Sequence, residues 1–138
     1  MAKAPVKLKV SGFKDERDVA EVSYSFTKGI DADGQPAGTP KGGLITLKVK
    51  ALNNANCDLL EWLNDTGKGK KGSIEFMEAK DNKKKMKSVE FQDAYCVKFE
   101  EHWEEKSDDS KELAHYELIT ISCRKITNGS VTYENEWT

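Results

Sequence analysis

Side chains that could carry out chemistry are present, but none of them stands in a pattern that a catalytic or metal site requires. His102 and His115 are the two histidines of the chain. They lack the i, i+4 spacing and the paired-cysteine neighbours that are typical of metal ligands. Serines are numerous, yet none lies in the strained, glycine-flanked turn that singles out a nucleophile. The sequence therefore predicts no catalytic, cofactor or metal site.

The glycine- and lysine-rich stretch 67–73 invites comparison with a phosphate-binding loop. That motif needs a lysine directly after its second glycine, and a helix must follow the loop. Here Ser73 and a strand-like pattern follow instead. We interpret the stretch as a flexible basic turn.

A run of carboxylates at 100–105 offers paired acids. An acid with a raised pKa needs apolar burial, and a run of this kind is usually a solvated surface. A hydrolase that used these groups would lose activity in Glu101→Gln or Glu104→Gln variants. Because acid density alone favours this hypothesis, we expect a protein that is not an enzyme.

Composition predicts one domain over residues 1–138, which is close to the usual size of a single domain. Hydrophobic residues make up 37% and charged residues 33%, and the net charge is −2. Such a balance favours neither nucleic acid nor anionic lipid. The first seven residues lack the apolar region of a secretory signal, and no stretch approaches the roughly 20 apolar residues that span a bilayer. We therefore expect cytoplasmic synthesis and no membrane insertion.

The three cysteines, Cys57, Cys96 and Cys123, are an odd number with wide spacing. Each has apolar neighbours in the sequence, which favours packed, reduced thiols over a disulfide framework.

Alternation of apolar and polar residues is the dominant pattern, and it predicts a mainly β protein. In the second predicted strand Val22, Tyr24 and Phe26 share one face, and strand 44–50 places Ile45, Leu47 and Val49 on the core face. Eight strands are predicted, over residues 6–10, 19–27, 44–50, 73–79, 86–91, 94–103, 115–125 and 131–133. Strands in this number favour a small barrel or sandwich, since closure removes exposed edges.

A single short helix is predicted over residues 58–65, with Asn56 and Asp58 as possible N-terminal caps. Two turns are too few to be stable alone, so the helix must cover an apolar opening elsewhere. The side chains expected to be buried are Leu59, Leu60, Trp62 and Leu63.

Residues 28–43 are rich in glycine, proline and aspartate, and they are predicted to form a loop. At about sixteen residues it is longer than the usual hairpin connection, and loops of this length are usually functional or disordered.

Charge is distributed unevenly. Residues 67–87 hold eight lysines against three acids, whereas residues 100–112 hold seven acids against two lysines. Opposed patches of this kind could serve repeating head-to-tail contacts between copies, although polar hairpin tips would give the same pattern. The candidate contact residues are Lys68, Lys70, Lys71, Glu101, Glu104 and Glu105.

Several strings, taken in their order and spacing, resemble the Bacteroidota-type branch of the Hcp/TssD family over about residues 6–137. The strings are Ser23–Phe26, Asp31–Pro36, Lys41–Gly43, Leu60–Trp62, Gly72–Met77, Val89–Val97, Ile121–Ile126 and Glu134–Trp137.

The resemblance implies a closed β-barrel, related to phage tail tubes, with one helix on its flank. Six copies would form a ring, and rings would stack head-to-tail into the inner tube of a type VI secretion apparatus, whose lumen can hold small effectors. The partners implied are the chain itself, the sheath, baseplate and spike proteins, and effectors. The subunit would assemble in the cytoplasm and leave the cell through the apparatus without a signal peptide.

The resemblance also implies that loop 28–43 reaches the next ring, with Asp31, Asp33, Gln35 and Pro36 as exposed contacts. An ordinary mobile loop is the alternative. For the whole chain, the alternative is a monomeric barrel that holds a small apolar ligand, which would require a roomy interior.

Overall fold

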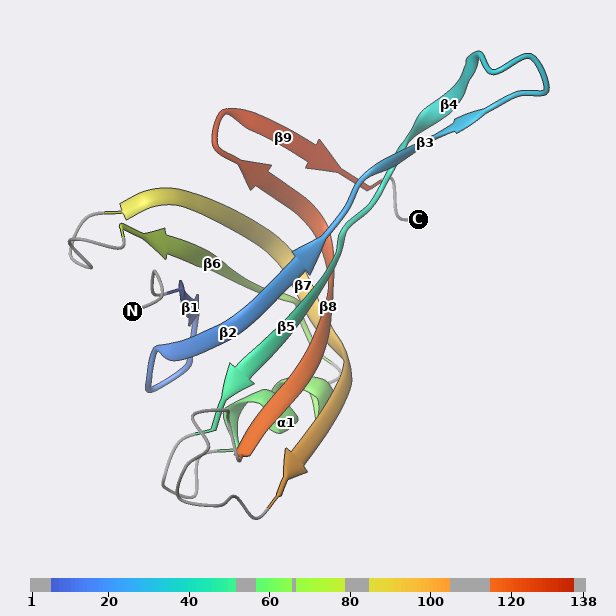
Figure 1. The fold of residues 1–138 in the computed structure, drawn as a ribbon. Helices are drawn as coiled ribbons and strands as arrows, with labels where there is room; N and C mark the ends of the chain where they lie inside the picture. The colour runs from blue at the N-terminus through green and yellow to red at the C-terminus, as the bar shows by residue number, and fades with distance from the viewer. Residues whose placement is uncertain (1–5, 52–56, 66, 79–84, 105–114, 136–138) are drawn as a thin grey trace.

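The computed structural model describes residues 6–51, 57–65, 67–78, 85–104 and 115–135, and it is a β structure with one short helix (Figure 1). The strands are β1 (Val6–Val10), β2 (Arg17–Tyr24), β3 (Thr27–Ile30), β4 (Pro36–Lys41), β5 (Leu44–Lys50), β6 (Lys70–Met77), β7 (Lys85–Trp103), β8 (His115–Asn128) and β9 (Val131–Glu134). The helix is α1 (Asp58–Asn64). It contains seven residues, and no helix in the described ranges is long and apolar enough to cross a bilayer.

Six strands close into a barrel, as the family resemblance implied, and this decides between the barrel and the sandwich that the strand pattern had left open. The order is β5-β2-β1-β6-β7-β8, and β5 also pairs with β8 in antiparallel register from Leu44↔Ser122 to Lys50↔Tyr116. Closure gives each of these strands a neighbour on both sides, which removes the exposed edges that an open sheet would have.

Strand β8 changes partner along its length. Its first part pairs with β5, and its last residues, Lys125 to Asn128, pair with β9. Strand β9 therefore lies outside the closed barrel and pairs with the end of β8 that extends beyond β5 (Figure 1).

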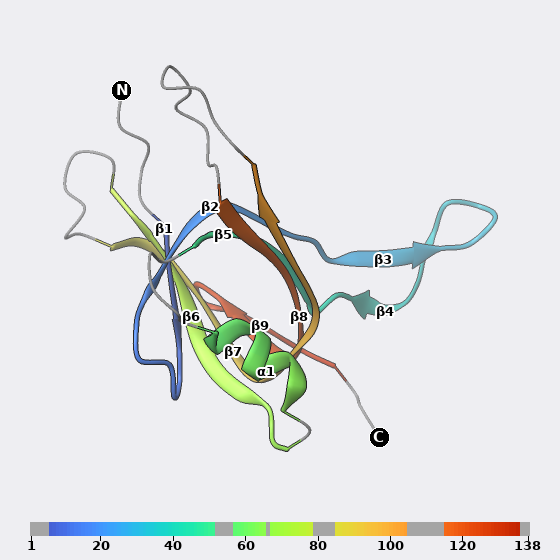
Figure 2. The ribbon, with the colours of Figure 1, turned by 90° about the horizontal axis from the view of Figure 1, so that it is seen from below.

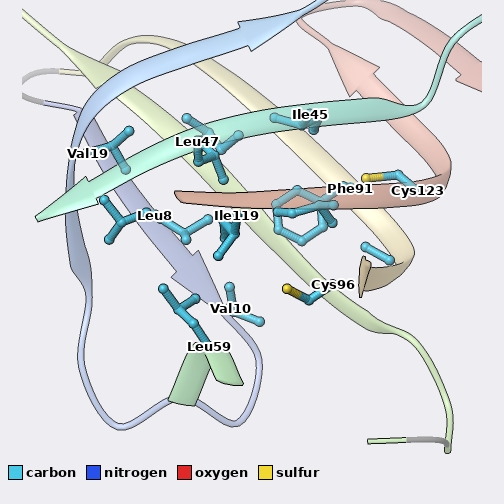
Figure 3. Close-up of a cluster of buried hydrophobic side chains, with 14 of the residues drawn as sticks. Leu8, Val10, Val19, Ile45, Leu47, Leu59, Phe91, Cys96, Ile119 and Cys123 are labelled. Carbon is cyan, nitrogen blue, oxygen red and sulfur yellow. The ribbon is translucent and has the colours of Figure 1, made fainter. Parts of the chain in front are cut away.

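The barrel interior is filled by side chains (Figure 3). The alternation predicted for β5 is confirmed, since Ile45, Leu47 and Val49 are fully buried. Leu8, Ile74, Val89, Phe91, Ala94, Ile119, Ile121 and Ile126 are at most 1% exposed. These side chains occupy the space that an apolar ligand would need, and this argues against the ligand-binding barrel.

Strand β2 differs from its prediction at both ends. It begins at Arg17 and ends at Tyr24, so Phe26 lies beyond it. A register irregularity between Val19 and Glu21 shifts the alternation, because a bulge places one extra residue in a strand. As a result Val19 is buried, while Val22 and Tyr24 are partly buried against the same core.

Helix α1 covers the barrel beside β7 (Figure 2). Trp62 is buried, its indole Nε1–H donates to the Ala94 carbonyl oxygen at 3.2 Å, and its ring stacks on Phe91 with centroids 6.3 Å apart. Leu59 is also buried, but the prediction for Leu60 is wrong, since that side chain is 41% exposed. A helix of two turns buries only a narrow face against the barrel, and Leu60 lies outside that face.

The predicted helix cap is also wrong. The N-cap position is Cys57, and no side chain caps the helix there. Asp58 instead lies in the first turn, where its negative charge favours the helix dipole. The other candidate, Asn56, falls outside the described residues.

The buried side chain of Arg17 links three strands by an ion pair and a hydrogen bond, which no sequence pattern predicted. Arg17 is 1% exposed, and its Nη2 donates to Glu117 Oε2 at 2.7 Å and to the Lys50 carbonyl oxygen at 3.1 Å. The other guanidinium nitrogens, Nε and Nη1, are buried and have no hydrogen-bond partner among the described residues. Glu117 is therefore the residue that balances the buried positive charge of Arg17.

Two of the three cysteines are packed thiols, as predicted. Cys96 and Cys123 are buried, and burial raises the pKa of these thiols to about 11 and about 12. Both thiols stay protonated at neutral pH and are poor nucleophiles. The prediction is wrong for Cys57, which is exposed at the start of α1.

Candidate functional site

Residues 28–43, predicted as a loop, are largely a two-stranded ribbon that extends away from the barrel (Figures 1 and 2). Strands β3 and β4 pair in antiparallel register, with Gly29 opposite Ala37 and Ile30 opposite Pro36. Every residue of both strands is exposed. The glycine and proline content that indicated a loop is tolerated because the ribbon has no core to pack against.

The tip of the ribbon is an ordered turn built around Asp31. Its carboxylate Oδ1 accepts the backbone N–H of Asp33 at 2.9 Å and that of Gln35 at 3.0 Å. Asp31 and Gln35 also share a backbone hydrogen bond of 2.9 Å, and Gly34 takes the positive φ of 83° that the turn requires.

The four predicted contact residues therefore lie together at this tip. Asp33, Gln35 and Pro36 are exposed there, whereas the Asp31 carboxylate is engaged in forming the turn.

An apolar side chain of the ribbon went unnoticed in the sequence. Ile30 is 71% exposed and lies beside the tip. The sequence feature that could have identified Ile30 is a large apolar residue next to a polar turn, in a segment without hydrophobic periodicity. A large apolar group on a projecting ribbon is a natural contact residue for another protein surface.

Lys70 and Lys71 are the first two residues of β6, and Lys68 lies two residues before the strand. They border a shallow, open hollow that Ser11 and Asp65 also line. Lys68 and Lys71 are exposed, and Lys70 is half-buried.

The acidic residues lie at the far end of β7, and histidines face them. Glu101 Oε2 is 2.6 Å from His115 Nε2, and Glu104 Oε2 is 3.4 Å from His102 Nε2. Glu105 falls outside the described residues. Lys70 pairs with Ala94, so the basic and acidic residues are separated by about 20 Å of extended strand. The structure thus keeps the two charged groups apart on the surface.

A third charged cluster lies on the barrel wall. Glu75 is 9% exposed, and its carboxylate contacts Lys9 Nζ and Lys85 Nζ, each at 3.0 Å. Burial alone would raise the pKa of Glu75, but the hydrogen bonds from Lys85 and Lys9 outweigh it and lower the pKa below 4.5. This arrangement holds a charged carboxylate in a wall of the barrel and stabilises the ionised form.

Within the residues that the structure describes, no group of three or more His, Cys, Asp and Glu side chains could hold a metal ion. The conspicuous features are instead a filled barrel, a projecting ribbon and separated charges. These features define the class of small closed β-barrels that carry a projecting two-stranded ribbon.

The family model for the hemolysin coregulated protein Hcp (TssD) matches residues 2–138. The chain belongs to the Hcp (TssD) family. It is a family of structural tube proteins of type VI secretion, whose members form self-assembling rings and are secreted through that system. The resemblance found in the sequence is confirmed.

Solved structures agree with this assignment. Hcp1 from Flavobacterium johnsoniae is 30% identical, with a TM-score of 0.82 over 95% of this chain and 99% of that one. Hcp1 from E. coli EAEC 042 is 14% identical, with a TM-score of 0.69 over 98% and 100%. Hcp1 from Salmonella typhimurium is 13% identical, with a TM-score of 0.70 over 96% and 95%. The last two show the shared fold. A comparison with curated proteins finds no significant match.

Proposed function

We propose that this chain is the subunit of a type VI inner tube, in which six copies form a ring and rings stack head-to-tail. Membership of a family of ring-forming tube proteins supports the ring. A ring with a repeated head-to-tail stack needs a second pair of complementary surfaces besides the contacts within the ring. The β3–β4 ribbon supplies one of these surfaces.

The observation that carries this proposal is the complete exposure of the ribbon in a single subunit. A two-stranded hairpin without a packed face is marginally stable in water. The ribbon nevertheless has an ordered tip and presents Ile30, with 71% of its surface exposed, beside Asp33 and Gln35. Contact with the next ring would bury Ile30 and give the tip polar partners.

Charge separation supports a second contact. The basic residues Lys68, Lys70 and Lys71 and the acidic residues Glu101, Glu104 and Glu105 are complementary in charge, so the basic group of one copy can contact the acidic group of its neighbour. Because exposed charges are screened by salt, this part of the assembly should weaken at high ionic strength. Assembly that is equally strong in low and high salt would remove the charged patches from the proposal.

In this function the subunit assembles in the cytoplasm, and a contractile sheath propels the tube together with its baseplate-mounted spike. Small effectors would travel in the lumen. The subunit would leave the cell with the tube and would need no signal peptide.

Mass photometry and negative-stain microscopy test the ring. Particles of about six chains with a central hole are expected, and a strict monomer at high micromolar concentration would contradict the proposal. Stacking is tested with Ile30→Lys, which should leave rings intact and shorten the stacks seen by sedimentation velocity. Met86→Lys is the matched control, because Met86 is 66% exposed but lies on the barrel strand β7.

A further inference from the structure

The ribbon is not a plain continuation of the barrel hairpin. The barrel strands β2 and β5 pair as far as Tyr24↔Ile45, and the ribbon pairing begins at Thr27↔Lys41 in a separate two-stranded sheet. The ladder of backbone hydrogen bonds is therefore interrupted between barrel and ribbon. Other contacts must set the direction in which the ribbon leaves the barrel.

At this interruption, strand β9 contacts both the segment that leads into β3 and the segment that follows β4 (Figure 1). On the entering leg, the Phe26 ring packs on the Tyr133 ring with centroids 5.0 Å apart. On the leaving leg, the Gly42 N–H donates to the Tyr133 hydroxyl at 2.9 Å, and the Gly42 carbonyl accepts from Asn135 Nδ2 at 3.2 Å. Both backbone polar groups of Gly42 are thus bound by β9 and the residue after it.

Three hydrogen bonds hold the side-chain amide of Asn135 in this network, and both of its N–H donors are used. Its second Nδ2 hydrogen goes to the Cys123 carbonyl at 2.9 Å, and its Oδ1 accepts from the Tyr133 hydroxyl at 2.7 Å. The Asn135 backbone N–H donates to the Arg124 carbonyl at 2.7 Å. Asn135 is thereby fixed to β8, a strand of the barrel, and through Gly42 it connects the ribbon to that strand.

Two glycines make this close fit possible. A Cβ atom on Gly42 would lie 2.4 Å from Phe26 Cδ1. Gly43 has a φ of +103°, and a Cβ there would lie 2.4 Å from Asn135 Nδ2 and 2.8 Å from the Cys123 carbonyl oxygen. The junction therefore closes on Asn135 and Phe26 only while positions 42 and 43 lack side chains.

Small changes at this junction are amplified at the tip. The ribbon is about six residues long, which corresponds to about 20 Å at about 3.3 Å per residue. A rotation of about 15° at the base would displace the tip by about 5 Å, which is more than a hydrogen-bond length. A contact made by the tip thus depends on how firmly the base is held.

We propose that Tyr133 and Asn135 are positioning residues for ring stacking: they lock the Gly42–Gly43 junction and so aim the β3–β4 ribbon at the next ring. This rests on the stacking role of the ribbon proposed above. Tyr133 and Asn135 bind the backbone of Gly42 in the same chain, and they affect the next ring only through the ribbon. Because these contacts fix the direction of the ribbon before assembly, less conformational entropy is lost when the ribbon contacts the next ring.

The test compares Asn135→Ala and Tyr133→Phe with Thr132→Val. Tyr133→Phe keeps the ring on Phe26 and deletes one hydroxyl from β9. Thr132→Val also deletes one hydroxyl from β9, but this hydroxyl bonds Thr127 Oγ1 at 3.1 Å and lies in another contact. Full-length proteins are examined for ring formation by mass photometry, for stacking by sedimentation velocity and negative stain, and for backbone protection by hydrogen exchange.

Asn135→Ala and Tyr133→Phe are expected to form rings as the unmodified protein does, and to lose stacking by roughly tenfold each, since each removes at least one part-buried hydrogen bond. Amides of residues 27–42 should exchange faster, while amides of β5 and β8 keep their protection. Thr132→Val should change none of these. A general structural role would instead speed exchange throughout the barrel and weaken the rings, and that outcome would overturn the proposal.

Two further outcomes separate this inference from the stacking role itself. Stacking that is lost in Ile30→Lys but unchanged in Asn135→Ala and Tyr133→Phe would refute the positioning role and leave the proposed function standing. Stacking that survives Ile30→Lys, or an unmodified protein that forms only single rings, would refute both. If Asn135→Ala fails to fold, Tyr133→Phe decides alone, because it removes a single oxygen atom.

Discussion

The barrel and the ribbon are built from strands of the same chain, yet they are opposites in what holds them together. In the barrel, closure gives each strand two neighbours and a shared interior in which Phe91, Ile121 and others are almost completely buried. In the ribbon, β3 and β4 have only each other among the described strands, and all their residues are exposed. It follows that most of the free energy of folding comes from the barrel, while the ribbon leaves its surface exposed.

The largest expected effect tests the barrel side of this comparison. Phe91→Ala should lower the free energy of unfolding by about 3–5 kcal/mol, because it removes a ring that is 1% exposed and stacked on Trp62. Ile30→Ala, in the ribbon, should change it by no more than about 0.5 kcal/mol. Urea unfolding at one fixed protein concentration measures both. Similar losses for the two variants would show that the ribbon contributes as much to stability as the barrel does.

The next effect concerns the buried charge in the barrel. Glu117→Gln should destabilise the fold by about 3 kcal/mol, since it leaves the Arg17 guanidinium buried without a counter-charge. The matched control is Asp18→Asn, which removes an exposed ion pair with Lys7 and should cost no more than about 1 kcal/mol. Equal effects in urea unfolding would show that burial does not distinguish the two pairs.

A smaller effect depends on pH and lies in the barrel wall. The pKa of Glu75 is lowered in the folded protein, so its contribution is present above its ordinary value near 4.5 and is lost as pH falls through the folded pKa. Glu75→Gln should cost less than about 1 kcal/mol at neutral pH, and the difference from the unmodified protein should vanish in acid. A difference that grows as the pH falls would have the wrong sign.

The smallest effect on folding is expected at the tip of the ribbon. Asp31→Ala removes the carboxylate that accepts two backbone N–H groups at the tip, so the amides of Asp33 and Gln35 should exchange with solvent faster. The free energy of unfolding should stay within about 0.5 kcal/mol of its original value, because the tip is outside the core. Asp33→Ala serves as the control, as its backbone and not its side chain makes the turn contact.

Sequence patterns predicted the barrel well because its strands obey local rules. Burial alternates along β5 as expected, and the apolar spacing around Trp62 placed a short helix correctly to within one residue. The register irregularity in β2 and the burial of Arg17 could not be foreseen, since both depend on which strand lies opposite. Leu60 was misplaced because two helical turns leave the buried stripe poorly defined.

The ribbon was harder to predict for a physical reason. Its glycines and prolines are typical of loops, and without a buried face it shows no alternation. The four residues that the family resemblance indicated, Asp31, Asp33, Gln35 and Pro36, lie at or beside the tip, and their role as contacts stays a prediction. The junction contacts of Gly42 with Tyr133 and Asn135 join residues more than 90 positions apart in the chain, and no local pattern reports such contacts.

The two prolines of β4 have a consequence for unassembled subunits. A free strand edge invites the backbone of another chain to pair with it, which is a common route to aggregation. Pro36 and Pro40 have no N–H group, so two of the six positions of β4 offer no donor to an added strand. The two prolines thereby hinder indiscriminate sheet extension along β4.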